Sequence, residues 1–112
     1  MLSTKEIVAK RKIFHDTDKK MALTFKVLSD VNRYRIFRIL VAQPKLSVSD
    51  MAQILDISLP LASQHIKILE LANLLQKERA GKTVFPILKY DNPLVQAAVK
   101  TIQQTLKHNG LK

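Results

Sequence analysis

The run SQHIK at residues 63–67 contains the side chains of this sequence that are best suited to reading another molecule. Serine and glutamine each donate and accept hydrogen bonds, and glutamine can form two hydrogen bonds to the edge of an adenine base. We expect Ser63 and Gln64 to contact base edges and Lys67 to contact a phosphate group. His65 lies beside them, where it packs against a neighbouring hairpin or the DNA backbone. The alternative is that these side chains only keep one face of a packed helix in water.

The run lies within residues 57–70, which have the apolar spacing of a helix. Ser58 can cap the start of this helix and present backbone amides to a phosphate, and proline is tolerated in the first turn. Ala62, Ile66 and Leu69 repeat at the spacing of an inner face. The opposite face carries Pro60, Ser63, Gln64 and Lys67. We expect these four to form a reading face, in which Pro60 contacts a thymine methyl group or only fixes the start of the helix.

Two other patterns resemble enzyme motifs, and neither is complete. The tripeptide GKT at 81–83 looks like the end of a phosphate-binding loop, but that loop needs a glycine at position 76, which is glutamine here. The neighbouring serine and histidine at 63 and 65 resemble a nucleophile and its base, but their places on the helix account for them. We therefore expect no enzyme, no catalytic residue and no cofactor.

Composition indicates a soluble globular protein with a polyanionic partner. The 112 residues suffice for one domain, and 46% of them are hydrophobic and 25% charged. Nineteen Lys and Arg against nine Asp and Glu give a formal charge of +10, which attracts nucleic acid or an acidic membrane surface unless it only serves solubility. The segment MLSTKEIVAKRK has no apolar stretch of signal-peptide or membrane-spanning length, so we expect a cytoplasmic protein with no membrane partner.

The first half of the chain has few helix breakers and is expected to form three helices. These are a basic helix over residues 3–15, a second helix capped within 16–18, and a third over 31–42, capped by Ser29 or Asp30. Their apolar residues are Ile7, Ile13 and Phe14 in the first, Met21, Phe25 and Leu28 in the second, and Ile36, Ile39 and Leu40 in the third. We expect the second and third sets to be buried.

A short helix is expected next, directly before the helix that carries SQHIK. Ser47 can cap it, with Asp50 as the partner in a capping box. Its inward-facing residues are expected to be Met51, Ile54 and Leu55. A tight connection at 56–58 then leads to the longer helix, which Asn73 should end because asparagine accepts the left-handed conformation.

Residues 74–88, LLQKERAGKTVFPIL, change to the pattern of two short strands around a glycine turn. Pro86 cannot donate to a strand ladder, so the second strand should lie at an edge there. Asp91 or Asn92 caps a last helix that begins at Pro93 and ends near Gly110. One face of that helix carries Val95, Ala98, Val99, Ile102 and Leu106.

The order of these elements predicts a mainly α fold, a winged helix-turn-helix with a two-stranded β-hairpin wing. In such a fold the short helix braces the longer one, whose outer face can enter a DNA groove. The chain resembles the ArsR (arsenic-repressor) family of winged helix-turn-helix transcriptional regulators. The matching stretches are FKVLSDVNRYRIFRIL, LSVSDMAQILDIS, ASQHIKILELANLL and KERAGKTVFPIL.

This resemblance implies a single domain over residues 1–112 and a homodimer built by its N- and C-terminal helices. The dimerising parts would be 1–28 and 91–110, the helix-turn-helix 47–72 and the wing 75–88. The dimer would bind a roughly palindromic operator in double-stranded DNA and usually repress. Arg79 and Lys82 lie at the wing tip, where they are expected to meet the minor groove or flanking phosphates.

The sequence departs from the family at its metal sites. Many relatives bind metal through cysteines in the short helix, at or near Ser47 and Ser49, and this chain contains no cysteine. A second family site uses carboxylates and histidines of the paired last helices. The last helix of this chain offers only His108, and a dimer that added His15 would still have too few ligands. We expect no metal site, and the inducing signal stays open.

A second class of function fits the basic composition: a winged-helix protein-interaction module that holds an acidic partner. DNA binding predicts positive charge concentrated on the reading helix and wing, whereas the module predicts charge elsewhere. Between Ser58 and Tyr90 the sequence has five basic and two acidic residues. The cluster at 10–12 is either an extra DNA-contacting arm or the solvated face of a dimerising helix.

Overall fold

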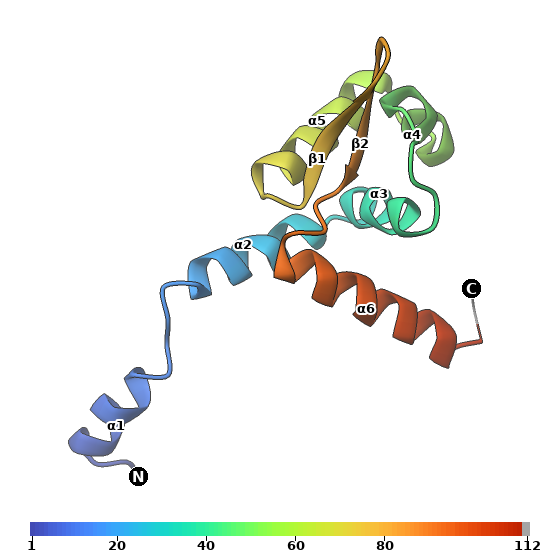
Figure 1. The fold of residues 1–112 in the computed structure, drawn as a ribbon. Coiled ribbons are helices and arrows are strands. Elements are labelled where there is room, and N and C mark those ends of the chain that lie inside the picture. Colours follow the sequence, from blue (N-terminus) through green and yellow to red (C-terminus); the bar gives the residue numbers. More distant parts are fainter. Residues whose placement is uncertain (111–112) are drawn as a thin grey trace.

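The computed structural model describes residues 1–110, which form six helices and one two-stranded antiparallel sheet (Figure 1). The elements are α1 Thr4–Arg11, α2 Asp18–Leu28, α3 Val31–Ala42, α4 Val48–Leu55, α5 Leu59–Leu71, β1 Leu75–Ala80, β2 Thr83–Leu88 and α6 Pro93–His108. The mainly α winged helix-turn-helix order expected from the sequence is therefore confirmed. None of the helices described combines the length and apolar character needed to cross a bilayer.

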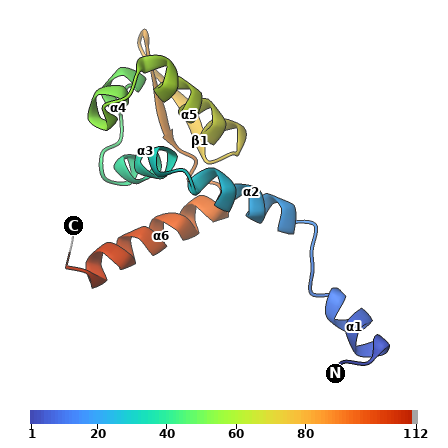
Figure 2. The same cartoon turned by 180° about the vertical axis from the view of Figure 1, so that it is seen from behind.

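Helix α3 lies at the centre of the molecule, between the α4–α5 pair with the hairpin on one side and α6 on the other (Figures 1 and 2). It contacts α2, α4, α5, β2 and α6. Ile36 and Phe37 of α3 are completely buried, and they pack in one core cluster with residues of every neighbouring element. The largest other fully buried side chains are Met51, Leu69, Leu74 and Val95. The sequence pattern named Ile39 instead of Phe37, and Ile39 is only partly buried.

The helix starts follow the expected caps because each depends on residues close in sequence. The Ser47 hydroxyl accepts the Asp50 N–H at 3.0 Å, and the Asp50 carboxylate accepts the Ser47 N–H at 2.9 Å, which completes the capping box of α4. Asp30 caps α3 by accepting the Arg33 N–H at 3.0 Å. The side chains of Ser58 and Asn92 cap α5 and α6 in the same way.

The N-terminal part differs from the sequence expectation. Helix α1 ends at Arg11 rather than near His15, because the Asp18 carboxylate accepts the His15 N–H at 3.1 Å and so favours a turn over another helical turn. Ile13 and Phe14 therefore lie outside the helix, and both are exposed. No residue of α1 is buried, and the helix lies apart from the body at the end of an extended arm (Figures 1 and 2).

Two expected buried faces are wrong for the single chain. Phe25 of α2 is 67% exposed and Met21 is also exposed, because no other part of residues 1–110 covers this side of α2. In α4, Ile54 is 55% exposed while Ala52 is buried beside Met51. At about 100° per residue, Ile54 points roughly 100° away from the centre of the face that α4 presents to α3 and α5.

Candidate nucleic-acid interface

The turn between α4 and α5 is fixed by backbone hydrogen bonds. Asp56 has a left-handed backbone with φ of 54°, which lets the Ile57 N–H donate to the Ala52 carbonyl at 3.0 Å. The Ser58 hydroxyl then accepts the Leu61 N–H at 3.2 Å and starts α5. The sequence predicted a tight connection here but not the left-handed Asp56. The turn sets the angle at which α5 leaves α4.

Helix α5 has the two faces that its sequence predicts. Ala62, Ile66 and Leu69 are buried against the core. The exposed side contains Pro60, Ser63, Gln64 and Lys67. Leu71 extends this side and is 77% exposed. Leu71 was not among the residues expected on this face, although its helical spacing places it between Gln64 and Lys67 around the helix axis.

His65 is placed differently from the expectation, since its side chain points inward and is 8% exposed. The ring Nδ1 lies 3.4 Å from Nη1 of Arg33 on α3 rather than beside the hairpin or on the outer surface. The helical spacing predicts a buried side chain at position 65, because this position lies three residues after Ala62 and four before Leu69. Residue type outweighed spacing in the sequence prediction, and His65 is not part of the exposed face.

Backbone hydrogen bonds also fix the end of α5. Asn73 has φ of 65°, its N–H donates to the Glu70 carbonyl at 3.0 Å, and the Leu74 N–H donates to the Leu69 carbonyl at 3.0 Å. This pair of bonds is the Schellman arrangement, with Leu74 buried beyond it. The expectation that Asn73 ends the helix is confirmed.

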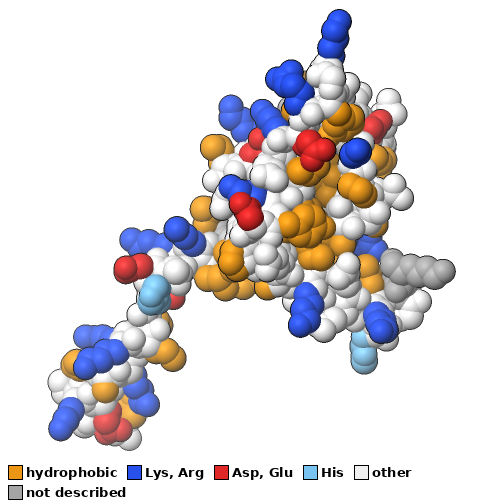
Figure 3. Space-filling view, viewed as in Figure 1, with side chains coloured by type: hydrophobic (Ala, Val, Ile, Leu, Met, Phe, Trp, Pro, Cys, Tyr) orange, Lys and Arg blue, Asp and Glu red, His pale blue; other side chains and the backbone are white. Residues whose placement is uncertain are grey.

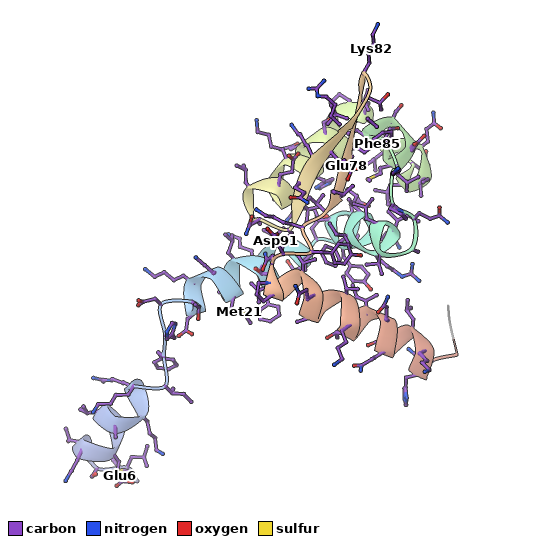
Figure 4. All side chains as sticks on the ribbon, in the orientation of Figure 1. Glu6, Met21, Glu78, Lys82, Phe85 and Asp91 are labelled. Atoms are coloured by element: carbon purple, nitrogen blue, oxygen red, sulfur yellow. The ribbon has the colours of Figure 1, made fainter. Side chains whose placement is uncertain are left out.

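The hairpin of β1 and β2 runs alongside α5 and projects past it (Figure 1). Leu75 pairs with Leu88, and Ala80 pairs with Thr83 across a turn formed by Gly81 and Lys82. Gly81 has φ of 63°, a value that glycine adopts without strain. Figure 4 shows the Lys82 side chain extending from the tip of the hairpin.

A groove of about 470 Å³ lies between α5 and the hairpin, with Ser63, Lys67 and Glu70 on one wall and Lys77 and Val84 on the other. Lys77 and Glu70 face each other at 3.8 Å across this groove. The pair is partly exposed and screened by solvent, so it contributes little to stability. The groove places the exposed face of α5 and the hairpin on one continuous surface.

Positive charge lies on this surface and also outside it. Figure 3 shows Lys and Arg side chains at the hairpin tip and beside it, and further ones along the N-terminal arm and around α6. Arg79 and Lys82 are exposed near the tip, and Lys67 is exposed on α5. The surface therefore combines hydrogen-bonding side chains on a helix with cations on an adjoining hairpin, the two elements with which winged helices contact DNA grooves and phosphates.

The chain is similar to known transcriptional regulators. The family described as "Helix-turn-helix domain" matches residues 28–78. The cadmium resistance transcriptional regulatory protein CadC of Listeria innocua serovar 6a is 33% identical over 81 residues, which cover 72% of this chain and 68% of CadC. CadC of Lactococcus lactis subsp. lactis matches to the same extent. The chain belongs to the ArsR family of winged helix-turn-helix transcriptional regulators.

Solved structures show that the ArsR-family fold extends over most of the chain. The transcriptional regulator HlyU from Vibrio vulnificus CMCP6 is 25% identical with a TM-score of 0.70, over 86% of this chain and 97% of that one. The homodimeric winged helix-turn-helix domain Mb0332 from Mycobacterium bovis has a TM-score of 0.66 at 17% identity, over 96% of this chain and 89% of that one. These relatives are regulators rather than enzymes.

The donor set of this ArsR-family chain does not fit a cadmium-type site. The sequence contains no cysteine. Residues 1–110 contain no group of three or more His, Asp or Glu side chains placed so that they could hold a metal ion. A tight site for a thiophilic or borderline metal needs three or four such ligands.

Proposed function

We propose that the protein is a homodimeric repressor that binds a palindromic operator with two α5 helices and two hairpin wings. The observation that carries this proposal is the exposed polar face of α5, held at both ends by caps and continuous with a basic hairpin. A helix fixed in this way can enter the major groove of DNA without a large entropic cost. The two-fold symmetry of a dimer would match two half-sites about one DNA turn apart.

Each residue of the proposed surface has a separate role. Ser63 and Gln64 would contact base edges, and Lys67 would contact a phosphate. Pro60 would lie nearest the groove at the helix start, and the capped start at Ser58 would present free N–H groups to a phosphate. Arg79 and Lys82 of the wing would contact the minor groove or flanking phosphates.

Exposed apolar side chains of α2 support the proposed dimer. Phe25 and Met21 of α2 line a groove of about 330 Å³ whose other wall is Leu94, Ala98 and Ile102 of α6. The arm gives the chain a radius of gyration of 17.6 Å, compared with about 13 Å expected for a compact chain of this length. A second copy would cover these surfaces, and the Mb0332 structure is of a homodimer.

In this arrangement residues 1–112 form one domain, with 47–72 as the helix-turn-helix and 75–88 as the wing. Residues 1–28 and 91–110 would build the dimer. Residues 111 and 112 lie outside the described part of the chain. Because its proposed ligand is genomic DNA, we place the protein in the cytoplasm.

The relatives are named for cadmium resistance. The signal that releases this protein from DNA would be a different one. The missing cysteines remove thiolate coordination from the 112 residues. Thiolate-dependent metal sensing is therefore not part of the proposed function.

The first experiment is fluorescence anisotropy with duplex DNA from upstream of the protein's own gene and with a scrambled duplex, at two salt concentrations. We expect at least about a hundredfold preference for one sequence and weaker binding at higher salt. Equal binding to both duplexes, followed by a random-sequence selection that enriches no motif, would contradict the proposal.

The second candidate function is a protein-interaction module, favoured by the basic side chains that lie away from α5 and the wing. Lys5, Lys10, Arg11 and Lys12 are all exposed on the arm. An acidic partner would then bind there and not at Gln64. The random-sequence selection separates the two candidates, because only a DNA reader enriches a motif.

A further inference from the structure

The partly buried contact between Arg33 and His65 has no place in the DNA surface described above. Arg33 is the third residue of α3, and its Nε donates a 2.8 Å hydrogen bond to the Val27 carbonyl. That carbonyl belongs to the last turn of α2, where backbone oxygens have no partner within the helix. On the same guanidinium, Nη1 lies 3.4 Å from Nδ1 of His65 on α5. One side chain therefore joins α2, α3 and α5.

A hydrogen bond across this contact requires one particular tautomer of His65. A guanidinium has only hydrogen-bond donors, so Nδ1 of His65 must offer a lone pair and the proton of the neutral ring must be on Nε2. A doubly protonated ring has two donors and no acceptor. Protonation would therefore break the Arg33 contact and place two positive charges against each other in a largely buried position.

Arg33 and Asp30, both at the start of α3, are the charged groups that the structure places in interaction with the ring. The Arg33 N–H donates to the Asp30 carboxylate, and this bond, more than the charge of Arg33, holds the pKa of Asp30 below its usual range against the opposing effect of burial. Asp30 is thus engaged as the cap of α3. It offsets part of the charge of a protonated ring but does not replace the lost hydrogen bond.

We infer that Arg33 is a positioning residue for the reading helix: it holds α5 through neutral His65 at a fixed distance from the end of α2, and protonation of His65 releases this link. The consequence for DNA rests on the proposed function of α5. Since α2 carries part of the proposed dimer surface, the link also connects dimer geometry to the reading helix.

The first test examines the free protein and does not require DNA. Nitrogen-15 NMR of the imidazole rings at about pH 8 should show His65 protonated on Nε2. Arg33→Lys keeps the charge but replaces the two nitrogens that contact Val27 and His65 with one, so amide hydrogen exchange in α5 should become about three- to tenfold faster. Arg35→Lys, an exposed neighbour on α3, is the matched control and should leave α5 unchanged. Protonation of His65 on Nδ1, or equal exchange in the two variants, would overturn the inference.

The second test compares specific with non-specific DNA affinity between about pH 8 and pH 5.5, a range in which histidine is the side chain that ordinarily changes charge. The ratio should fall about three- to tenfold in the wild-type protein. It should stay constant in His65→Gln, whose amide oxygen accepts from Arg33 but does not titrate. A double variant of the exposed His15 and His108 to Gln is the control and should keep the wild-type profile.

The outcomes separate the inference from the proposed function. A wild-type profile in His65→Gln would overturn the inference even if DNA binding is specific. A wild-type protein without any sequence preference would overturn the proposed function, and the NMR and exchange results would then support or overturn the positioning role by themselves.

Discussion

The side-chain amide of Asn92 donates a 2.7 Å hydrogen bond to the backbone carbonyl of Asn73, the left-handed residue that follows α5. The side-chain oxygen of the same Asn92 accepts the Leu94 N–H at 2.9 Å and caps α6. Nearby, the Lys89 N–H donates to the Leu74 carbonyl at 3.1 Å. The end of α5 and the start of α6 are therefore fixed to each other by one side chain and by the adjoining backbone.

Asn92→Ala should destabilise the protein by about 1–2 kcal/mol, because it removes a helix cap and the link to Asn73 together. Urea unfolding followed by circular dichroism measures this difference. Asn109→Ala is the matched control at the other end of α6, where the asparagine is exposed and its side chain has no hydrogen bond within the described residues. Equal unfolding midpoints for the two variants would show that the Asn92 link contributes nothing.

The features that the sequence predicted correctly depend on neighbours in the chain. The capping box of Ser47 and Asp50 joins residues three apart, and the left-handed Asn73 follows from the tolerance of asparagine for that conformation. The two strands on either side of Gly81 follow from a short turn that contains glycine. Each of these features is determined by residues close to one another in the chain, so the sequence alone can predict it.

The early end of α1, which the sequence missed, follows from the local hydrogen bond between His15 and Asp18. Other missed features depend on how distant elements pack. Ile54 faces solvent because α3 and α5 cover α4 from a slightly different side than its apolar spacing suggests. Phe25 has the spacing of a buried residue, but nothing in the described part of its own chain covers it. His65 was placed by residue type, and only the position of Arg33 in space reveals its partner.

Stability should decrease in acid partly through Asp50. Hydrogen bonds from the Ser47 backbone and then from its side chain lower the pKa of the Asp50 carboxyl. A lowered pKa in the folded state means that the stabilisation is complete above the usual aspartate pKa, about 4, and is lost as the pH falls through the folded value. In Asp50→Asn the cap no longer titrates, so acid unfolding should depend less steeply on pH below about 4. Thermal melts across this range check the slope, and identical slopes would exclude a role for Asp50.

Gln64→Ala should weaken operator binding by about 1–3 kcal/mol and relax the preference at one base pair, because a base-edge contact carries sequence information. Lys82→Ala is the comparison, since a phosphate contact should weaken binding to all sequences and reduce the salt slope by about one. Anisotropy titrations over a set of single-base operator variants distinguish the two patterns. An unchanged preference in Gln64→Ala would remove Gln64 from the reading surface.

Phe25→Ala tests the proposed dimer. A symmetric interface contains two copies of this ring, and the loss of two buried phenylalanines should weaken association by about 3–6 kcal/mol, or at least about a hundredfold in Kd. Because Phe25 is 67% exposed in the single chain, the fold of each subunit should change little. Sedimentation equilibrium measures association, and Lys26→Ala, at the next exposed position of α2, should behave as the wild type. If Phe25→Ala and Lys26→Ala associate equally well, the dimer forms through another surface.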